Sequence, residues 1–471
     1  MDDRHGYPTC LALGWAAGLL ALVIGVAAPG GAAAAAAGLT ELVSVRNNGH
    51  QGDGISGRAS APTVSANGLV VAFDSSATNL VGGDTNGAVD VFVRDRASGR
   101  TERVSVSSRG RQGNGGSTGP AVSGDGRFVV FESSATNVVP GDTNVRNDIF
   151  VRDRLSGETT RVSVAADGTQ SDNHSIGPAV SADGRFVAFA SDASNLVPEP
   201  ASGRQVYVKD LVTGAVERVS VSSGGDPAVG FTTPPAISGD GNVVTFAAGA
   251  TNLVPGDTNG QLDVFSHDRA TGVTERVSVD SAGGEGDGPS FIPDINGDGR
   301  FVTYASEASN LVAADTNGVR DVFVHDRATG VTERVSVDSA GAEANGQSIG
   351  PGIRGGSAFG SSITADGRLV AFDSIATNLV PGDTNTCQPF FPNPGQCPDV
   401  FVHDRLTGAT VRMSVDSTGG QADGASTDPD ISADGSTTAF FSAATNLVAG
   451  DTNTCGGFPN PGECPDIFVH V

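Results

Sequence analysis

The chain has 471 residues, a formal net charge of −25 at pH 7 and only 17% charged residues, with 66 glycines. So acidic a chain repels phosphate backbones and anionic membrane surfaces, which argues against nucleic acid as a partner and favours cations or basic proteins. We expect no membrane contact beyond an N-terminal anchor.

The first 38 residues are typical of an export signal. Residues 11–28 are nearly all apolar, and the alanine-rich run 32–37 offers several small-x-small cleavage sites. Asp2 and Asp3 outweigh Arg4, however, which is unusual for a signal, and about 18 apolar residues suffice for an uncleaved bilayer anchor. Residues 1–38 are therefore predicted to be a signal peptide, with an N-terminal anchor as the alternative. Either places the rest outside the bacterial cytoplasm, secreted or in the cell envelope.

From residue 39 onward one pattern recurs seven times: an Asp-Gly or Asn-Gly turn, a short apolar strand, an Asn-Leu-Val-like loop and a strand resembling Asp-Val-Phe-Val. The turns begin at Ser65, Ser123, Ser181, Ser238, Asn296, Thr364 and Ser432. A fixed period with strand-like units is typical of a β-propeller. We expect an all-β, seven-bladed propeller over residues 39–471, with repeats starting near residues 62, 120, 178, 235, 293, 360 and 429.

The repeat beginning at Pro178 illustrates the expected blade. Residues 179–181 and 186–189 flank an Asp-Gly turn, the strongest local hairpin signal, and strands at 206–208 and 217–221 follow. Four antiparallel strands make one blade. Six repeats place a proline just before the first strand, where an edge strand tolerates it: Pro62, Pro120, Pro178, Pro235, Pro293 and Pro429.

The two ends of the propeller segment complement each other. Residues 468–471 correspond to a third strand, so the last repeat lacks its fourth, and residues 40–45 correspond to a fourth strand with no blade of their own. We expect the N-terminal strand to complete blade seven and close the ring.

The repeats resemble the WD40-like (PD40) propeller repeats of the TolB family. The resemblance rests on the S-x-D-G-R-x-V-A-F strand pair at residues 181–189 and the D-V-F-V-x-D strand at residues 321–326, and it covers about residues 39–471. It implies an exported, non-catalytic propeller that works by binding other macromolecules, either another protein or a component of the cell envelope.

An Asp-Thr-Asn-x-x-x-Asp pattern follows the second strand of four repeats. It offers oxygen atoms at positions 1, 3 and 7, a spacing that suits Ca²⁺, although an EF-hand-like loop would add an oxygen at position 5 and a bidentate acid. Calcium is the only cofactor suggested, and the alternative is that the side chains form Asx-turns. The candidates are Asp84, Asn86, Asp90, Asp142, Asn144, Asp148, Asp257, Asn259, Asp263, Asp315, Asn317 and Asp321.

Histidine occupies one equivalent position of the third strand in four repeats, as His267, His325, His403 and His470. Equivalent positions of neighbouring blades lie on the order of 13 Å apart if third strands, at a strand spacing of about 4.8 Å, sit roughly 15 Å from the axis, and metal–nitrogen bonds are about 2 Å. The other repeats carry Arg or Lys there. We therefore expect a structural contact, such as an acidic partner between blades, and no metal.

Repeats six and seven carry matching insertions that contain all four cysteines beyond the signal. Cysteines closing short loops in an exported chain are typical of local disulfides: Cys387 with Cys397, and Cys455 with Cys464. Zinc is the weaker alternative, because structural sites favour C-x₂₋₄-C spacing. Phe390, Phe391 and Phe458 in these insertions are candidate anchors for a partner, and packing within the loop is the other interpretation.

The sequence contains no G-x-S-x-G, H-E-x-x-H or P-loop motif. The first hypothesis is therefore a non-catalytic binding scaffold whose partner surface is the acidic loop face. The alternative is a secreted propeller enzyme, a hydrolase or lyase acting on polysaccharide or peptide at one channel mouth. Channel-lining residues that break the sevenfold pattern would favour the enzyme, and uniform lining would favour the scaffold.

Overall fold

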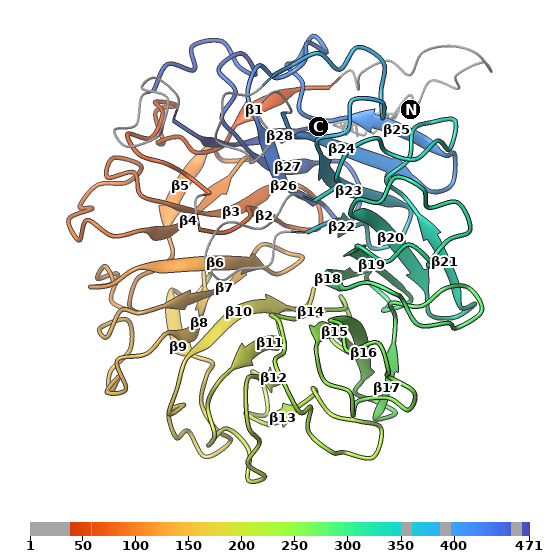
Figure 1. The fold of residues 1–471 in the computed structure, drawn as a ribbon. Helices are drawn as coiled ribbons and strands as arrows, with labels where there is room; N and C mark the ends of the chain where they lie inside the picture. The colour runs from red at the N-terminus through yellow and green to blue at the C-terminus, as the bar shows by residue number, and fades with distance from the viewer. Residues whose placement is uncertain (1–37, 58, 350–359, 387–396, 454–463) are drawn as a thin grey trace, which may run out of the picture. The chain divides into compact units, whose positions relative to one another are not determined.

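The computed structural model describes residues 38–57, 59–349, 360–386, 397–453 and 464–471. They form seven four-stranded antiparallel sheets arranged around a centre, which confirms the predicted β-propeller (Figure 1). None of the described residues forms a helix with the length and apolar character of a membrane span. The signal peptide expected at the N-terminus lies almost wholly outside the described residues and stays a prediction.

Each blade runs outward from an inner strand. Blade one contains β2 (Thr63–Val64), β3 (Val70–Ser75), β4 (Asp90–Asp95) and β5 (Arg100–Arg103). Blade two contains β6 (Ser117–Val122), β7 (Phe128–Ser133), β8 (Asp148–Asp153) and β9 (Glu158–Arg161). Blade three contains β10 (Ser175–Val180), β11 (Phe186–Ser191), β12 (Gln205–Asp210) and β13 (Val216–Arg218). Blade four contains β14 (Ala236–Ile237), β15 (Val243–Ala248), β16 (Asp263–Asp268) and β17 (Val273–Arg276).

The remaining blades follow the same order. Blade five contains β18 (Ser290–Ile295), β19 (Phe301–Ser306), β20 (Asp321–Asp326) and β21 (Val331–Arg334). Blade six contains β22 (Ser362–Ile363), β23 (Leu369–Ser374), β24 (Asp399–Asp404) and β25 (Ala409–Arg412). Blade seven combines β26 (Ser426–Ile431), β27 (Thr438–Ser442) and β28 (Asp466–His470) with β1 (Thr40–Leu42) from the other end of the chain.

The second and third strands of each blade supply most of the core. Their aromatic residues pair across the sheet, as Phe131 and Phe150 do with ring centroids 5.7 Å apart. Both rings are fully buried between neighbouring blades, and burying a phenylalanine side chain stabilises the fold by about 1.5–3 kcal/mol. The same pair recurs in every blade, so the repeated strands account for much of the hydrophobic stabilisation.

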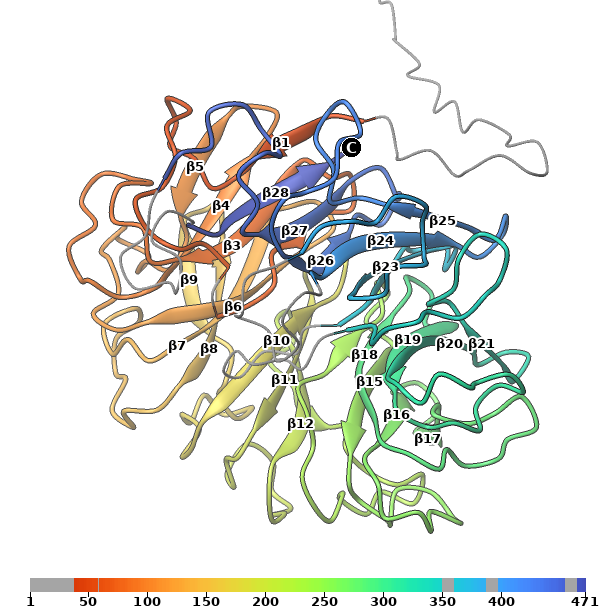
Figure 2. The same cartoon turned by 45° about the horizontal axis from the view of Figure 1, so that its top comes forward.

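The closing strand has the predicted partner. β1 pairs antiparallel with β28, Thr40 opposite His470 and Leu42 opposite Phe468, and Figure 2 shows the red N-terminal strand beside the blue C-terminal strands. The Ser44 hydroxyl donates a 2.5 Å hydrogen bond to Asp466. The ring is therefore closed by pairing the two ends of the described chain.

The inner strands differ from the expectation for proline. In four blades the first strand begins three residues before the proline, so Pro120, for example, lies inside β6. The register shifts there, between Thr118 and Ala121, and Gly119 has a φ of 61°. A bulge leaves one residue out of the hydrogen-bond ladder, and proline fits because it has no N–H to pair. The prediction that proline precedes the strand was wrong in these blades.

Candidate functional site

The loops that join the second and third strands, together with the loops leading from one blade to the next, form one face of the propeller, here called the loop face. In blade one, the Asn86 side chain closes an Asx-turn by accepting the Ala88 N–H at 2.9 Å. Its amide donates to Asp90 at 3.3 Å. An amide nitrogen cannot bind a cation, so this geometry matches the Asx-turn interpretation of the loop.

An arginine lies between the acidic groups of these loops. Arg103 Nη1 is 3.0 Å from Asp90 Oδ2 and 3.4 Å from Asp84 Oδ1. Equivalent arginines contact the equivalent aspartates in four more blades: Arg161, Arg276, Arg334 and Arg412. The guanidinium therefore provides the positive charge that a calcium ion would have supplied.

Blade four contains the described group of acids best spaced for a metal. Asp257, Asp263 and Glu285 offer oxygen atoms that all lie within 4.8 Å of one another. Arg276 Nη1 contacts all three side chains, at 3.8 Å from Asp257, 3.3 Å from Asp263 and more closely at Glu285. A cation would have to displace a largely buried guanidinium, so the residues present do not fit calcium well, and calcium binding stays an untested prediction.

Two blades depart from this arrangement. In blade seven, Leu42 pairs with Phe468 in the register that Arg103 occupies opposite Phe92 in blade one. Burial raises the pKa of Asp466 to about 7, and no arginine of the described residues forms an ion pair with it. In blade three the reverse holds: Arg218 is present but its partner strand carries Gln205 in place of the aspartate.

The histidine row has a structural role. His325 Nδ1 lies 2.9 Å from the hydroxyl of Thr332, which donates to the Val279 carbonyl of the preceding blade. Arg152 makes the matching contacts to Thr159 and to backbone carbonyls. The expected structural contact is present, but the proposed acidic partner was wrong: the partner is a threonine hydroxyl. Burial lowers the pKa of His325, which keeps the ring neutral.

The cysteine insertions lie partly outside the described residues. Cys397 and Cys464 are buried and disulfide-bonded. Their expected partners, Cys387 and Cys455, are not among the described residues, so the pairing stays a prediction. The candidate anchors Phe390, Phe391 and Phe458 also lie outside the described part of the chain.

A cavity of about 200 Å³ lies where the inner strands of all seven blades meet. We refer to it as the channel pocket. Its wall is built by the residue that follows the proline position of each repeat, and these residues are Thr63, Ala121, Ala179, Ala236, Asp294, Ser362 and Asp430. The wall is therefore not uniform, because four of these positions carry polar side chains and three carry alanine.

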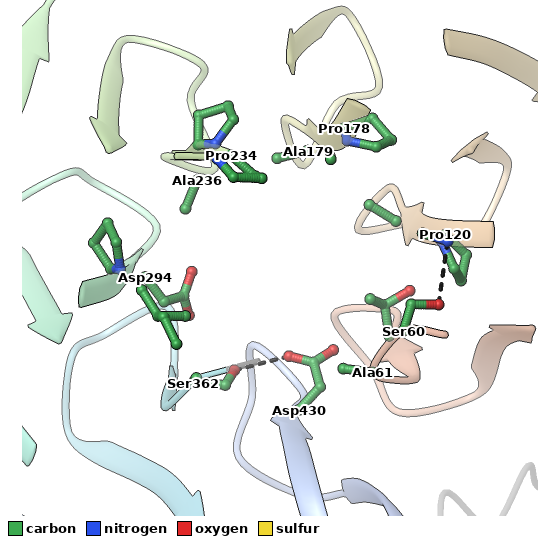
Figure 3. A pocket seen from close by; sticks show the side chains of 18 of the residues that line it. Ser60, Ala61, Pro120, Pro178, Ala179, Pro234, Ala236, Asp294, Ser362 and Asp430 are labelled. Carbon is green, nitrogen blue, oxygen red and sulfur yellow. Dashed lines mark hydrogen bonds between the residues drawn. The ribbon is translucent and has the colours of Figure 1, made fainter. Parts of the chain in front are cut away.

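The polar and apolar positions lie on opposite sides of the pocket. Blades five, six, seven and one are neighbours in the ring and contribute Asp294, Ser362, Asp430 and Thr63, whereas blades two, three and four contribute alanines. Figure 3 shows both carboxyl groups directed toward the open centre and the alanines facing them with several prolines. The pocket thus has a polar arc and an apolar arc.

Both carboxyl groups are partly held by the inner strands. Asp430 accepts the Val64 N–H at 2.7 Å and the Ser362 hydroxyl at 2.8 Å. Asp294 accepts the Ile363 N–H at 3.1 Å. Each bond joins one blade to the next, and the bonds from Val64 and Ile363 satisfy N–H groups of inner edge strands, so these acids also have a structural role.

The two acids share an environment that disfavours charge. Burial, and then repulsion from Asp430, raises the pKa of Asp294 to about 7, and burial raises that of Asp430 to about 6. Each side chain remains half-buried, because it borders the cavity. Near neutral pH the pair therefore carries a charge that a cation entering the pocket could neutralise.

No family model matches the chain, and no curated protein matches it. Among solved structures, the chain is similar to a puromycin-hydrolyzing peptidase from Mycobacterium tuberculosis, with 15% identity, a TM-score of 0.50, and coverage of 83% of this chain and 50% of the peptidase. TolB from Acinetobacter baumannii matches with 14% identity and a TM-score of 0.40 over 68% of this chain. The chain spans 58% of that TolB protein.

An oligogalacturonate lyase from Vibrio parahaemolyticus matches with 12% identity and a TM-score of 0.49, covering 93% of this chain and 98% of the lyase. The similarity at these identities is one of fold. A shared β-propeller fold does not by itself distinguish the two hypotheses.

Sequence reasoning missed the channel acids. Asp294 and Asp430 each follow a proline at the start of a repeat, where three other repeats have alanine. That irregularity was visible in the sequence. Its importance was not, because only the closed ring brings the seven inner strands to one cavity.

Proposed function

We propose that this chain is an extracytoplasmic, non-catalytic β-propeller that binds a protein or another component of the cell envelope. The observation that carries the proposal is that the recurring charged groups hold the fold together: arginines neutralise the loop aspartates, and threonines hold the histidines. The disulfide-bonded state of Cys397 and Cys464 supports a location outside the cytoplasm.

The loop face is the proposed partner surface. Aspartates in the loops that lead from one blade to the next hydrogen-bond to the loop after the second strand. Asp423, for example, accepts the Thr445 N–H at 2.7 Å and remains exposed. Asp53, Asp172 and Asp287 make the same bond between other blades, so the face presents a preorganised acidic surface. Such a surface favours a basic partner through electrostatic steering.

An enzyme remains the second candidate because the channel pocket breaks the sevenfold pattern. Asp294 and Asp430 have raised pKa values, which a general acid or base requires near neutral pH. Against catalysis, both acids occupy equivalent positions and accept hydrogen bonds from neighbouring blades. The loop aspartates of blades one, two, four, five and six form ion pairs with arginine, which leaves them poorly suited to catalysis.

A crosslinking experiment tests the proposal. A photo-crosslinking residue is placed at Asp423 on the loop face, and in a matched protein at Asp125, an exposed acid of an inner hairpin turn on the other face. Each full chain is exposed to cell-envelope extract of the source bacterium. We expect a discrete adduct from position 423 and none from position 125. Equal or absent adducts, together with turnover of an oligosaccharide or peptide that Asp294→Asn abolishes, would establish the enzyme instead.

A further inference from the structure

The channel pocket has the chemistry of a receptor for one small organic cation. Thr63 lines the polar arc, and its hydroxyl oxygen is buried without a hydrogen-bond partner. Asp430, whose carboxylate binds the adjacent Val64 N–H, stands next to it around the ring.

The number and type of acceptors narrow the ligand class. Two carboxylates border a cavity of about 200 Å³, and an ammonium group has three donors to offer them. Calcium requires six to eight oxygen ligands, which the arc does not provide. A guanidinium binds a carboxylate best through two parallel hydrogen bonds, and both oxygens of Asp430 already accept a bond, one from Val64 and one from Ser362.

The apolar arc indicates which chemical group of the ligand is attached to the cationic group. Ala179 and Ala236 lie across the cavity from Asp430 (Figure 3), and Ala121 and several prolines line the same cavity. The volume is below the 300–1,000 Å³ typical of sites for drug-sized ligands, so the occupant is short. A linear alkyl stem carrying a terminal ammonium group matches both arcs at once.

We propose that the channel pocket binds a primary alkylammonium group, with the ammonium between Asp294 and Asp430 and the alkyl stem against the alanine arc. The proposal rests on the binding function proposed above and names the chemistry that this site recognises. Two sources share that chemistry, a lysine side chain of a partner protein and a free small amine. Ionised carboxylates bind the cation, so the raised pKa values of the two acids make affinity increase from pH 5 to pH 8.

Calorimetric titration of the full folded chain with n-butylammonium tests the inference, with n-butanol as the neutral analogue of similar shape. We expect butylammonium to bind at pH 8, with at least tenfold lower affinity at pH 5, and butanol not to bind. Asp294→Asn should lower the affinity at least tenfold, whereas Asp125→Asn, which removes the same charge from an exposed turn, should not. Equal binding of both ligands, or no binding at pH 8, overturns the inference.

Asp294 also joins two blades, so Asp294→Asn could reduce binding by destabilising the fold, and a second variant controls for this. Ala179→Leu narrows the cavity from the apolar side and leaves both acids in place, so it should abolish butylammonium binding while thermal unfolding stays within a few degrees. Unchanged affinity in this variant also overturns the inference.

A lysine peptide that competes with butylammonium identifies the source as a protein side chain, and a peptide that does not compete identifies it as a free amine. If the crosslinked partner persists while butylammonium never binds, the scaffold function stands and the channel inference fails.

Discussion

Replacing Arg334 with leucine would copy into blade five the arrangement that blade seven already has. Arg334 lies 2.9 Å from Glu343, 3.3 Å from Asp321 and 3.5 Å from Asp315, and its side chain is 8% exposed. Removing one member of a buried ion pair costs about 3–5 kcal/mol because the remaining charge stays buried. We therefore expect Arg334→Leu to lower the free energy of unfolding by about 3–5 kcal/mol at pH 8.

The pH dependence separates charge from packing. Burial raises the pKa values of Asp315 and Asp321, and without the guanidinium they rise further. An acid whose pKa is higher in the folded state than in the unfolded state stabilises the fold at low pH. That stabilisation is lost as the pH rises through the folded-state pKa. The loss caused by Arg334→Leu should therefore be largest at pH 8 and shrink toward pH 5.

The matched control is Arg218→Leu in blade three. Arg218 has the same register but faces Gln205, so its replacement removes contacts with Tyr207 and the loop without uncovering a paired acid. Calorimetric unfolding of both variants at pH 5, 6.5 and 8 measures the difference. A loss for Arg334→Leu that is the same at every pH, or a matching pH trend for Arg218→Leu, would refute the electrostatic reasoning.

Three further predictions concern closure and the histidine row. Deleting residues 39–45 should lower the melting temperature sharply, because it removes the fourth strand of blade seven; an unchanged value would disprove the closure. The pKa of Asp466 is about 7, so the stability that this group contributes at low pH is lost as the pH rises from about 4 to 7. Leu42→Arg should therefore raise the free energy of unfolding by roughly 1–2 kcal/mol at pH 8 and by little at pH 4, as measured by urea unfolding. His325→Arg should change the free energy of unfolding by less than about 1 kcal/mol, because Arg152 makes the equivalent contacts in blade two, and a large loss would show that the ring itself is required.

The blade pattern was predictable because its determinants are local. An Asp-Gly turn sets hairpin geometry within a few residues, as Asp183 does by accepting the Arg185 N–H at 2.9 Å. Repeating that signal specified blade number and strand order. The bulges before the prolines were not predictable in the same way, because a bulge depends on register with the neighbouring strand.

The loop acids illustrate a signal that was present but not used. An arginine follows the last aspartate by 13 residues in several repeats, as Arg103 follows Asp90 and Arg334 follows Asp321. In a four-stranded blade this spacing places the pair on adjacent strands, Phe92 opposite Arg103. Acidic spacing alone suggested calcium, and including the arginine would have favoured an ion pair.

The amino-acid sequence by itself determined the seven blades, because turn chemistry and strand alternation act over short distances. It also indicated the closing strand, because residues 40–45 match the fourth strand of the repeat, and β1 within them pairs with β28. The tertiary structure decided which charges are neutralised and which face the channel. Asp294 and Asp430 are 136 residues apart, yet they border one cavity through closure of the ring. Their pKa values depend on burial, and that of Asp294 also on the nearby charge of Asp430. Neither the burial nor the proximity exists before the blades assemble.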